Sequence, residues 1–286
     1  MILSGQARLA GVIGWPVAHS LSPRLQGYWL DRYEIDGAYL PLPLAPEALA
    51  RALPVLAELG FRGFNVTLPH KEAVPALCDE VSSEARRIGA VNTVVIRDGR
   101  LEGSNSDAFG FAENLCQGAP AWRPEAGPAV VLGAGGAARA VIVALQDLGV
   151  PEIRLTNRTA ARAAALAEDL APPQGRAPDV VPWERRDAAL EGAGLLVNTT
   201  ALGMSGQPPL EIALDALPAS ALVTDIVYAP LETPLLAAAR ARGNAVVDGL
   251  GMLLHQARPG FEAWFGRAPE VTEALRAFVL AGRPAD

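Results

Sequence analysis

Short apolar runs alternate with longer amphipathic stretches along this chain. The runs at 9–14, 38–42 and 63–66 have the length of buried strands, whereas 22–32 and 46–59 carry apolar residues at helical spacing. This alternation predicts an α/β fold, in which strands form mostly parallel sheets and helices cover the sheet faces.

The same alternation continues through the rest of the first half. Asp98-Gly99 lies between two β-like runs and is typical of a hairpin turn. The other expected elements of this region are helices at about 70–76 and 80–88, strands at 91–96 and 100–102, and a helix that begins near Ser106 or Asp107.

Residues 118–128 are rich in proline and glycine and indicate a domain boundary. Beyond them, strand-like and helix-like segments alternate again, and the last two helices follow without a strand between them. The expected strands are 129–132, 152–156, 195–198, 222–225 and 245–247, and the expected helices are one that ends near Leu148 and those at 160–170, 234–241, 250–265 and 269–281.

Composition and charge narrow the function classes. Of 286 residues, 50% are hydrophobic and 19% charged, so a packed core is expected and disorder is not. The net charge of −7 argues against nucleic-acid binding. No run is long enough for a membrane span, and the first residues do not resemble a signal peptide. Cys78 and Cys116 lie in no metal-ligand spacing, so we expect reduced thiols, no metal and a cytoplasmic location.

Residues 130–139 form a predicted strand, a glycine turn and the start of a helix. Gly133, Gly135 and Ala138 have the spacing of the G-x-G-x-x-G/A dinucleotide fingerprint. Gly133 allows the tight turn, Gly135 lets the backbone approach a pyrophosphate, and Ala138 lets the helix pack closely on the strand. Such turns also serve plain packing, but this one opens a β-α-β unit whose helix N-terminus can face phosphates, so we predict a dinucleotide site.

The residues after the next strand predict which dinucleotide binds. An NAD site usually has an acidic residue there, whereas this chain has Arg158, with Arg162 one helical turn further on. Guanidinium groups suit a 2′-phosphate, so we expect NADP; a solvated helix start is the structural alternative. The cofactor-binding residues expected from this unit are Gly133, Ala134, Gly135, Gly136, Ala137, Asn157, Arg158, Thr159 and Arg162.

Four polar clusters interrupt the otherwise apolar first half. They are Ser20-Leu-Ser22, Asn65-Val-Thr67 with Lys71, Asn92, and Asn105-Ser-Asp107. Most follow predicted strands or open predicted helices, where α/β proteins bind ligands. Each cluster also has a structural explanation, because Ser22 and Asp107 could cap helices and Asn65 and Thr67 could form turns.

Together these segments resemble the shikimate dehydrogenase family over nearly the whole chain. The matching motifs, in chain order, are Ser-Leu-Ser-Pro (20–23), Asn-Val-Thr-Leu-Pro-His-Lys (65–71), Gly-Ala-Val-Asn-Thr (89–93), Asn-Ser-Asp (105–107), Gly-Ala-Gly-Gly-Ala-Ala-Arg (133–139), Asn-Arg-Thr (157–159), Asn-Thr-Thr-Ala-Leu-Gly-Met (198–204), Asp-Ile-Val-Tyr (225–228), Thr-Pro-Leu-Leu (233–236) and Gly-Met-Leu-Leu-His-Gln (251–256).

The resemblance implies NADPH-dependent reduction of 3-dehydroshikimate to shikimate, a step of aromatic amino acid and chorismate biosynthesis. It implies that Ser20 and Ser22 hold the substrate carboxylate with Tyr228 nearby, and that Lys71 and Asp107 form the catalytic pair. The residues implied to hold ring hydroxyls or to order the site are Asn65, Thr67, Asn92 and Gln256. The further residues implied at the cofactor are Asn198, Thr199, Met204, Ile226 and Gly249.

The chemistry of the pair is reasonable without the family. Hydride delivery to a ketone places negative charge on its oxygen, which must then receive a proton. The Lys71 ammonium can stabilise that charge and donate the proton, and the Asp107 carboxylate can orient the ammonium and relay a proton. A carboxylate partner and desolvation shift a lysine pKa in opposite directions, so the sequence does not fix its value.

The resemblance also implies two α/β domains. Residues 1–107, completed by 249–286, would bind the small-molecule substrate on a mostly parallel sheet, and 108–248 would form a Rossmann-like NADP domain. The C-terminal helices would return to the first domain because Gln256 must reach the substrate, with the active site in the cleft between domains. The sequence leaves a homodimer open.

Two positions depart from the family pattern, and two other functions stay open. Gln26 stands where the family usually has histidine, and Ser106 where it has threonine; we expect a packing consequence, because no proposed catalytic group is lost. The alternatives are a quinate/shikimate dehydrogenase that uses NAD, and a catalytically silent sensor of NADP and shikimate. Retention of Lys71 and Asp107 argues against the sensor.

Overall fold

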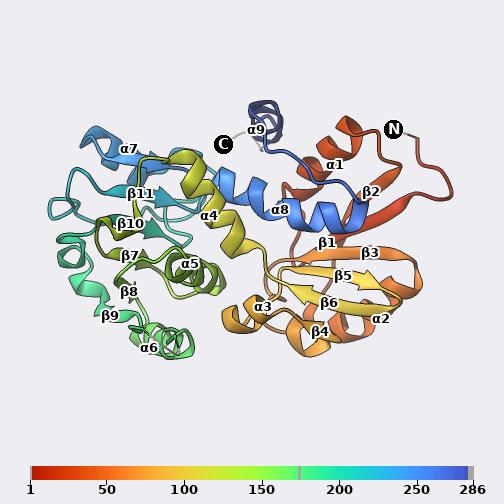
Figure 1. Ribbon diagram of the computed structural model, residues 1–286, viewed down its shortest axis with the longest axis horizontal. Helices are drawn as coiled ribbons and strands as arrows, with labels where there is room; N and C mark the ends of the chain where they lie inside the picture. The colour runs from red at the N-terminus through yellow and green to blue at the C-terminus, as the bar shows by residue number, and fades with distance from the viewer. Residues whose placement is uncertain (1, 173–174, 283–286) are drawn as a thin grey trace. The chain divides into compact units, whose positions relative to one another are not determined.

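The structure, a computed structural model, describes residues 2–172 and 175–282. Its described residues divide into two compact units (Figure 1). The first unit runs to Ser106 and resumes at Leu254, and the second runs from Asp107 to Leu253. The proline-rich segment 118–128 lies inside the second unit, so a boundary there is wrong. Residues 283–286, within the expected C-terminal range, lie outside the described residues.

The first unit contains a six-stranded sheet in the order β2-β1-β3-β5-β6-β4. Strands β1, β2 and β3 are parallel, β5 runs antiparallel to β3 and β6, and β4 pairs parallel with β6. The expected mostly parallel sheet is therefore mixed at one side. The bounds are β1 Arg8–Gly14, β2 Gly37–Pro43, β3 Phe61–Val66, β4 Glu80–Val81, β5 Thr93–Arg97 and β6 Arg100–Ser104.

Helices cover both faces of this sheet (Figure 1). They are α1 Ser22–Arg32, α2 Leu49–Glu58, α3 Ser83–Ile88, α8 Leu250–Phe265 and α9 Glu273–Leu280, with 3-10 turns at Pro46–Ala48 and Val74–Leu77. Phe64 packs in one cluster with Leu49 and Leu53 of α2. At the neighbouring Gly63, which has φ +150°, an added Cβ would lie much closer than van der Waals contact to the Val94 carbonyl oxygen and to the indole nitrogen of Trp264 on α8. Glycine is required there because a side chain would overlap both groups.

The C-terminal helices pack on the first unit, as expected from the sequence. The Trp264 indole N–H donates to the Val94 carbonyl at 3.0 Å. Trp29 of α1 meets Phe261 of α8 edge-on, with ring centroids 5.2 Å apart. On α9, the Phe278 ring lies under the Arg24 guanidinium at 3.9 Å. Trp29, Phe261 and Trp264 are buried by these contacts, whereas Phe278 stays partly exposed, and the buried aromatic surface stabilises the packing of α8 on the first unit.

The second unit contains a six-stranded, fully parallel sheet in the order β12-β11-β10-β7-β8-β9. The strands are β7 Ala129–Leu132, β8 Ile153–Asn157, β9 Asp179–Pro182, β10 Leu195–Asn198, β11 Leu222–Asp225 and β12 Ala245–Val247. This is the strand order of doubly wound dinucleotide-binding folds, with the reversal between β7 and β10. The predicted α/β class is confirmed.

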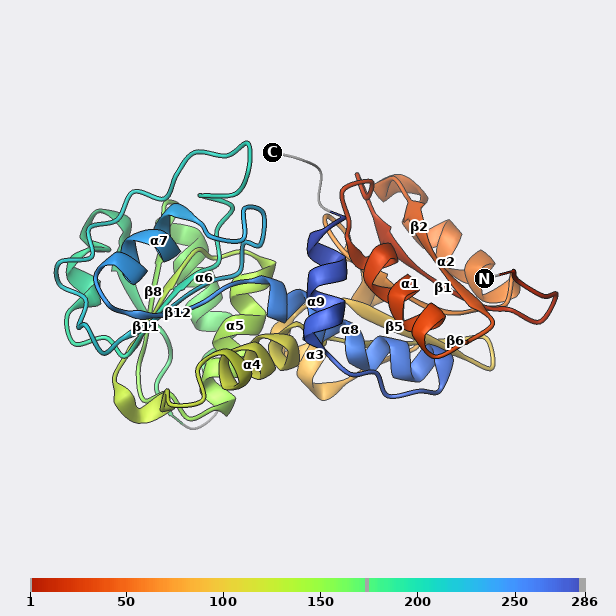
Figure 2. The same ribbon diagram turned by 90° about the horizontal axis from the view of Figure 1, so that it is seen from above.

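Helices surround this sheet (Figure 2). They are α4 Asp107–Gly118, α5 Gly136–Asp147, α6 Ala160–Asp169 and α7 Pro234–Ala241, with 3-10 turns at Pro124–Ala126, Trp183–Arg185 and Ala188–Leu190. Leu235 and Leu236 of α7 pack with Leu132, Leu196 and Val223 of the strands in one buried cluster. Continuous apolar strands of this kind are expected where a parallel sheet is buried on both faces.

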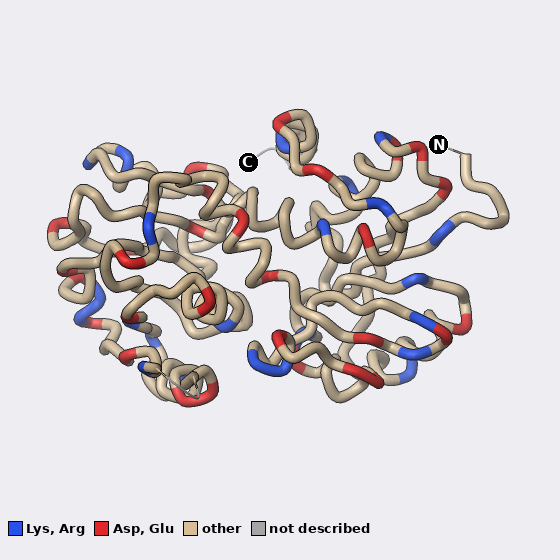
Figure 3. Tube along the Cα trace, viewed as in Figure 1, with Lys and Arg blue, Asp and Glu red and all other residues tan. Residues whose placement is uncertain are grey.

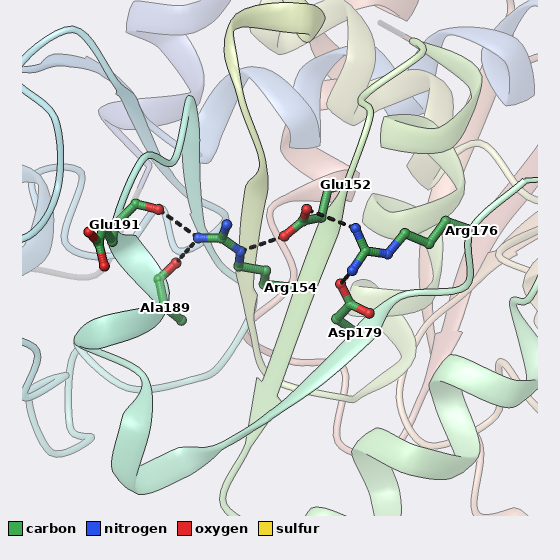
Figure 4. Close-up of polar contacts among 6 residues, drawn as sticks. All are labelled: Glu152, Arg154, Arg176, Asp179, Ala189 and Glu191. Carbon is green, nitrogen blue, oxygen red and sulfur yellow. Dashed lines mark hydrogen bonds and ion pairs between the residues drawn. The ribbon is translucent and has the colours of Figure 1, made fainter.

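Strand β9 forms one edge of this sheet and was not predicted. A polar network joins it to the strand beside it (Figure 4). Arg154 of β8 donates to three groups outside its own strand: the Glu152 carboxylate at 2.7 Å, the Ala189 carbonyl at 2.8 Å and the Glu191 carbonyl at 2.7 Å. Arg176 then pairs with Glu152 at 2.9 Å and with Asp179 of β9.

The region 70–88 differs most from the sequence-based elements. The helix expected at 70–76 is wrong, because the chain there forms turns and the 3-10 segment Val74–Leu77. Pro75 has no N–H to donate to a longer helix. The helix expected at 80–88 begins only at Ser83, since Glu80 and Val81 pair with Glu102 and Gly103 of β6.

Candidate functional site

Three of the four polar clusters meet where β3 and β6 end and β5 begins in the first sheet. Asn65 near the end of β3 pairs in register with Thr93 at the start of β5, and Thr93 pairs with Ser104 at the end of β6. Because β5 runs antiparallel to both neighbours, its first residue lies beside the last residues of β3 and β6. The segments around 65, 92 and 105 are therefore neighbours although they are distant in sequence.

The Asn65 carboxamide forms hydrogen bonds with three other groups of the protein. Its Oδ1 accepts from the Tyr39 hydroxyl at 2.6 Å, and its Nδ2 donates to the Asn92 carbonyl and to Thr93 Oγ1, both at 3.1 Å. The side chain is buried. Both donor hydrogens of Asn65 therefore already have protein acceptors.

Hydrogen bonds join Asn92 and Ser106. Asn92 Oδ1 accepts from the Ser106 backbone N–H at 2.9 Å, and Asn92 Nδ2 donates to Ser106 Oγ at 3.1 Å. Ser106 Oγ donates to the carbonyl of Gln256 at 2.8 Å. Helix α8 thus brings Gln256 to the segment that carries Asn92, as expected for a residue that completes the first unit.

Ser22 is the first residue of α1, and Ser20 lies in the segment 15–21 that joins β1 to this helix. The Ser22 backbone N–H donates to Ser20 Oγ at 3.3 Å, and neither residue is fully exposed. Ser22 does not cap α1 with its side chain, so the helix-cap explanation fails for it. Burial raises the pKa of the Tyr39 hydroxyl well above its ordinary value, and a hydrogen bond with the Ser22 side chain partly opposes this shift.

Lys71 and Thr67 follow β3 in a turn that backbone bonds hold. The Thr67 N–H donates to the Ile13 carbonyl at 2.9 Å, and the Lys71 carbonyl accepts from the Val91 N–H at 2.9 Å. Both side chains are half-buried. Lys71 is therefore held beside the residue that precedes Asn92.

Asp107 and Tyr228 belong to the second unit. Asp107 is buried and is the first residue of α4, directly after Ser106. Tyr228 is half-buried in the loop after β11, and burial raises the pKa of its hydroxyl above 10.0.

Gln26 is fully buried on α1, one turn after Ser22. Neither of its amide atoms has a hydrogen-bond partner among the described residues. An unpaired buried amide costs about 1–3 kcal/mol per group. The expected packing consequence of this departure therefore includes an energetic cost.

The glycine turn of the second unit lies at the strand-order reversal. Gly133 follows β7 with φ +107°, a conformation that L side chains rarely adopt. Thr199, which follows β10, donates from its N–H and its hydroxyl to the Leu132 carbonyl, at 2.9 and 2.7 Å. The two strand ends are thus bonded together where doubly wound folds bind ligands.

A hollow of about 220 Å³ opens at this turn. It is smaller than the roughly 300–1,000 Å³ of sites that enclose a drug-sized ligand, so it suits one part of a dinucleotide. Its lining includes the predicted residues Gly133, Ala134, Gly135, Asn157, Arg158, Arg162 and Thr199. The predicted residues outside this lining are Gly136, Ala137, Thr159, Asn198, Met204, Ile226 and Gly249.

Five lining residues were not predicted: Trp183, Thr200, Ala201, Leu202 and Gln207. Residues 200–202 lie inside a motif already quoted from the sequence, so adjacency to Thr199 could have found them. Trp183 and Gln207 carry no such signal. Two arginines at one hollow with a closely approachable backbone fit the phosphate-bearing part of NADP.

Asn198 shapes the loop beside this hollow. It is fully buried, and its carboxamide donates to the Leu202 carbonyl and to the Asp225 carboxyl, both at 3.1 Å. Asp225 also accepts from the Val227 N–H at 3.0 Å and the Thr233 hydroxyl at 2.8 Å. Burial raises the pKa of the Asp225 carboxyl, and these three hydrogen bonds partly oppose the shift.

Charged residues of both signs are interspersed over the two units (Figure 3).

Among the described residues, no group of three or more His, Cys, Asp or Glu side chains could hold a metal ion. Within residues 2–172 and 175–282, no helix is long and apolar enough to cross a membrane.

Two family descriptions match this chain. Residues 12–94 match the shikimate dehydrogenase substrate binding domain, and residues 249–277 match the shikimate 5'-dehydrogenase C-terminal domain. The shikimate dehydrogenase (NADP(+)) of Paramagnetospirillum magneticum is 63% identical over 280 residues, which cover 98% of this chain and 100% of that protein.

Two solved structures are similar along nearly their whole length. The shikimate 5-dehydrogenase of Thermus thermophilus in complex with NADP(H) and shikimate has a TM-score of 0.85 and 40% identity, with 96% of this chain and 99% of that chain covered. The quinate dehydrogenase from Corynebacterium glutamicum in complex with NAD has a TM-score of 0.90 and 33% identity, with 96% and 99% covered.

Proposed function

This chain belongs to the shikimate dehydrogenase family, and we propose from that premise that it catalyses the NADPH-dependent, reversible reduction of 3-dehydroshikimate to shikimate. In this proposal the first unit binds the substrate and the second binds NADP. The family match over residues 12–94 supports the first assignment, and the hollow lined by Arg158 and Arg162 supports the second.

One observation carries the proposed acid–base chemistry. Lys71 is the only lysine among the 24 lysine and arginine residues of the chain. The other 23 (24 − 1) are arginines, which supply a permanent positive charge, but a guanidinium does not release a proton in proteins. A single retained lysine is therefore expected where a cation must donate and recover a proton.

The local structure around Lys71 supports its pairing with Asp107. The backbone of Lys71 bonds to Val91, and Asn92 bonds to Ser106, the residue before Asp107. When bound, NADPH supplies the hydride for the carbonyl carbon. The Lys71 ammonium stabilises the negative charge on the substrate oxygen and donates a proton there, and the Asp107 carboxylate orients the ammonium.

Substrate and cofactor preference separate the proposal from its nearest alternative. A similar structure is a quinate dehydrogenase with NAD, so the fold does not distinguish the two acids. Here Arg158 and Arg162, rather than a carboxylate, line the hollow after β8, which favours NADP. We further propose a cytoplasmic location, because Cys78 and Cys116 are both free thiols.

The test follows NADPH absorbance with shikimate or quinate and with NADP or NAD. We expect turnover to be fastest with shikimate and NADP, and Arg158→Ala to weaken NADP more than NAD. Faster turnover of quinate with NAD would establish the alternative enzyme, and no turnover with any pair would favour the silent sensor.

Variants of Lys71 test the acid–base role. Lys71→Ala should lower kcat by about 10²–10⁴-fold, because the general acid is removed. Lys71→Arg keeps the positive charge but does not release a proton, so kcat should fall while the KM for shikimate changes less. Near-normal turnover of Lys71→Ala would exclude this role.

A further inference from the structure

A series of hydrogen bonds joins the segments of the first unit that carry the proposed substrate residues. It includes two residues that the sequence did not assign, Tyr39 on β2 and Thr93 on β5. Tyr39, Asn65, Thr93, Asn92 and Ser106 are each at most 6% exposed. In such a buried setting an unmade hydrogen bond is costly, so the bonding pattern constrains each side chain.

The series has one direction, because backbone groups that only accept or only donate bond to both carboxamides. Tyr39 donates to Asn65 Oδ1 at 2.6 Å, and Asn65 Nδ2 donates to Thr93 Oγ1 at 3.1 Å. Thr93 then donates to Asn92 Oδ1 at 2.8 Å. The Asn92 carbonyl only accepts and the Ser106 backbone N–H only donates, so these two groups fix which end of each carboxamide is oxygen. Tyr39 and Thr93 each donate a further hydrogen bond to the oxygen of one carboxamide and so reinforce its orientation.

Asn92 continues the series on the other side. Its Nδ2 donates to Ser106 Oγ at 3.1 Å, and Ser106 Oγ donates to the Gln256 carbonyl at 2.8 Å. The longer contacts of Ser106 Oγ, 3.2 Å to Asn92 Oδ1 and 3.3 Å to Thr93 Oγ1, are weaker arrangements for the same protons. Turning either carboxamide over would place N–H groups against donors and break several bonds at once.

We propose that Tyr39 and Thr93 are positioning residues, which together with Asn65 hold the Asn92 carboxamide in the one orientation suited to a hydroxyl of a cyclic polyol acid. This inference rests on the proposed function and deepens it. Neither residue needs to touch the substrate, because each acts through an asparagine.

Two further features support this role for Tyr39. Burial raises the pKa of its hydroxyl, so the group stays protonated and keeps donating to Asn65. The Ser22 side chain, proposed to hold the substrate carboxylate, partly opposes this rise in the pKa of the Tyr39 hydroxyl and therefore lies near it. One side chain thus connects the proposed carboxylate and hydroxyl ends of the substrate region.

The decisive comparison is Thr93→Val against Thr93→Ser. Valine has nearly the shape of threonine but no hydroxyl, so Asn65 Nδ2 and Asn92 Oδ1 each lose a partner, whereas serine keeps both bonds. Loss of these hydrogen bonds should weaken shikimate binding by about 1–2 kcal/mol, which corresponds to roughly a 5–30-fold rise in the KM for shikimate. Thr93→Ser should recover most of this loss, and the KM for NADP should stay unchanged in both.

Tyr39→Phe is the second variant, which removes only the phenolic oxygen and keeps the ring. We expect the same selective rise in the shikimate KM. Tyr33→Phe is the matched control, because the Tyr33 hydroxyl accepts from the Glu270 N–H outside the series. Melting temperatures measured alongside show whether any variant fails by unfolding.

The outcomes are distinguishable. Selective loss of shikimate affinity in Thr93→Val and Tyr39→Phe, with recovery in Thr93→Ser, supports the proposal. An unchanged shikimate KM in both variants overturns it, as does a parallel loss of shikimate and NADP affinity with melting temperature, which indicates a purely structural role. If the unmodified enzyme does not turn over shikimate, the proposed function fails first and this inference fails with it.

Discussion

The three glycines of the turn after β7 should respond differently to the addition of one methyl group. At Gly133, φ is +107°, and a Cβ would lie 2.8 Å from Thr199 Oγ1 and 2.9 Å from Thr200 Cγ2. At Gly135 the backbone is extended, with φ −103° and ψ −173°, and an added methyl would meet nothing within 4 Å. At Gly136, the first residue of α5, the space is also open.

From these geometries we expect Gly133→Ala to lower stability and Gly135→Ala to weaken cofactor binding. Gly133→Ala should lower the free energy of unfolding by about 2–6 kcal/mol, from roughly 1–3 kcal/mol of backbone strain and a similar cost of overpacking. Gly135→Ala should change it by less than about 0.5 kcal/mol. Because Gly135 lines the hollow, its methyl would keep a pyrophosphate from the backbone. Loss of one charge-assisted hydrogen bond, about 1.5–3 kcal/mol, weakens NADP binding roughly 10–150-fold.

Gly136→Ala is the matched control for this series. It belongs to the predicted dinucleotide turn but lies outside the lining of the hollow, so alanine there should raise stability by about 0.4–1 kcal/mol and weaken NADP binding less than Gly135→Ala does. Urea unfolding gives the stability of each variant, and fluorescence titration with NADP gives its affinity. Unchanged NADP binding in a folded Gly135→Ala protein would refute the assignment of this turn to the pyrophosphate.

Two further predictions concern stability. Gln26→Met removes two buried polar atoms without partners and should raise the free energy of unfolding by about 1–3 kcal/mol. The exposed control Gln6→Met should change it by less than about 0.5 kcal/mol. A Gln26→Met protein that is less stable in urea unfolding would contradict this expectation. Hydrogen bonding to Arg154 lowers the pKa of the Glu152 carboxyl below its ordinary value of 4.5, so its stabilising effect is present above pH 4.5 and is lost as the pH falls through the lowered value. The stability difference between the unmodified protein and Glu152→Gln should therefore be largest at neutral pH and shrink in acid; a difference that grows in acid would reverse the sign.

The sequence predicted the elements whose pattern is local. Helix α1 has the bounds expected from its apolar spacing and the proline after Ser22, and strands β7, β10, β11 and β12 follow their apolar runs. The hairpin between β5 and β6 follows from Asp98-Gly99, where both residues adopt positive φ. The elements that were missed depend on distant partners. Glu80 and Val81 are a strand only because β6 lies beside them, and β9 has exposed, alternating residues at a sheet edge.

The residues of the candidate site also fall into two groups, those that the sequence identified and those that only the structure revealed. The glycine turn, Arg158 and Lys71 were identified from residue types and spacing, because their chemistry is carried by the side chain or by the lack of one. Trp183 and Gln207 reach the hollow only through folding, and Tyr39 becomes part of the polar series only because β2 lies near Asn65.

By itself, the sequence determined the fold class, the dinucleotide turn and the identity of the reactive groups, since these follow from periodicity, backbone freedom and functional-group chemistry. Only the tertiary structure decided which polar atoms face one another and in which direction each hydrogen bond runs. The physical reason is that a carboxamide or hydroxyl both donates and accepts, so its role is fixed only when buried neighbours from other strands take up its hydrogens and lone pairs.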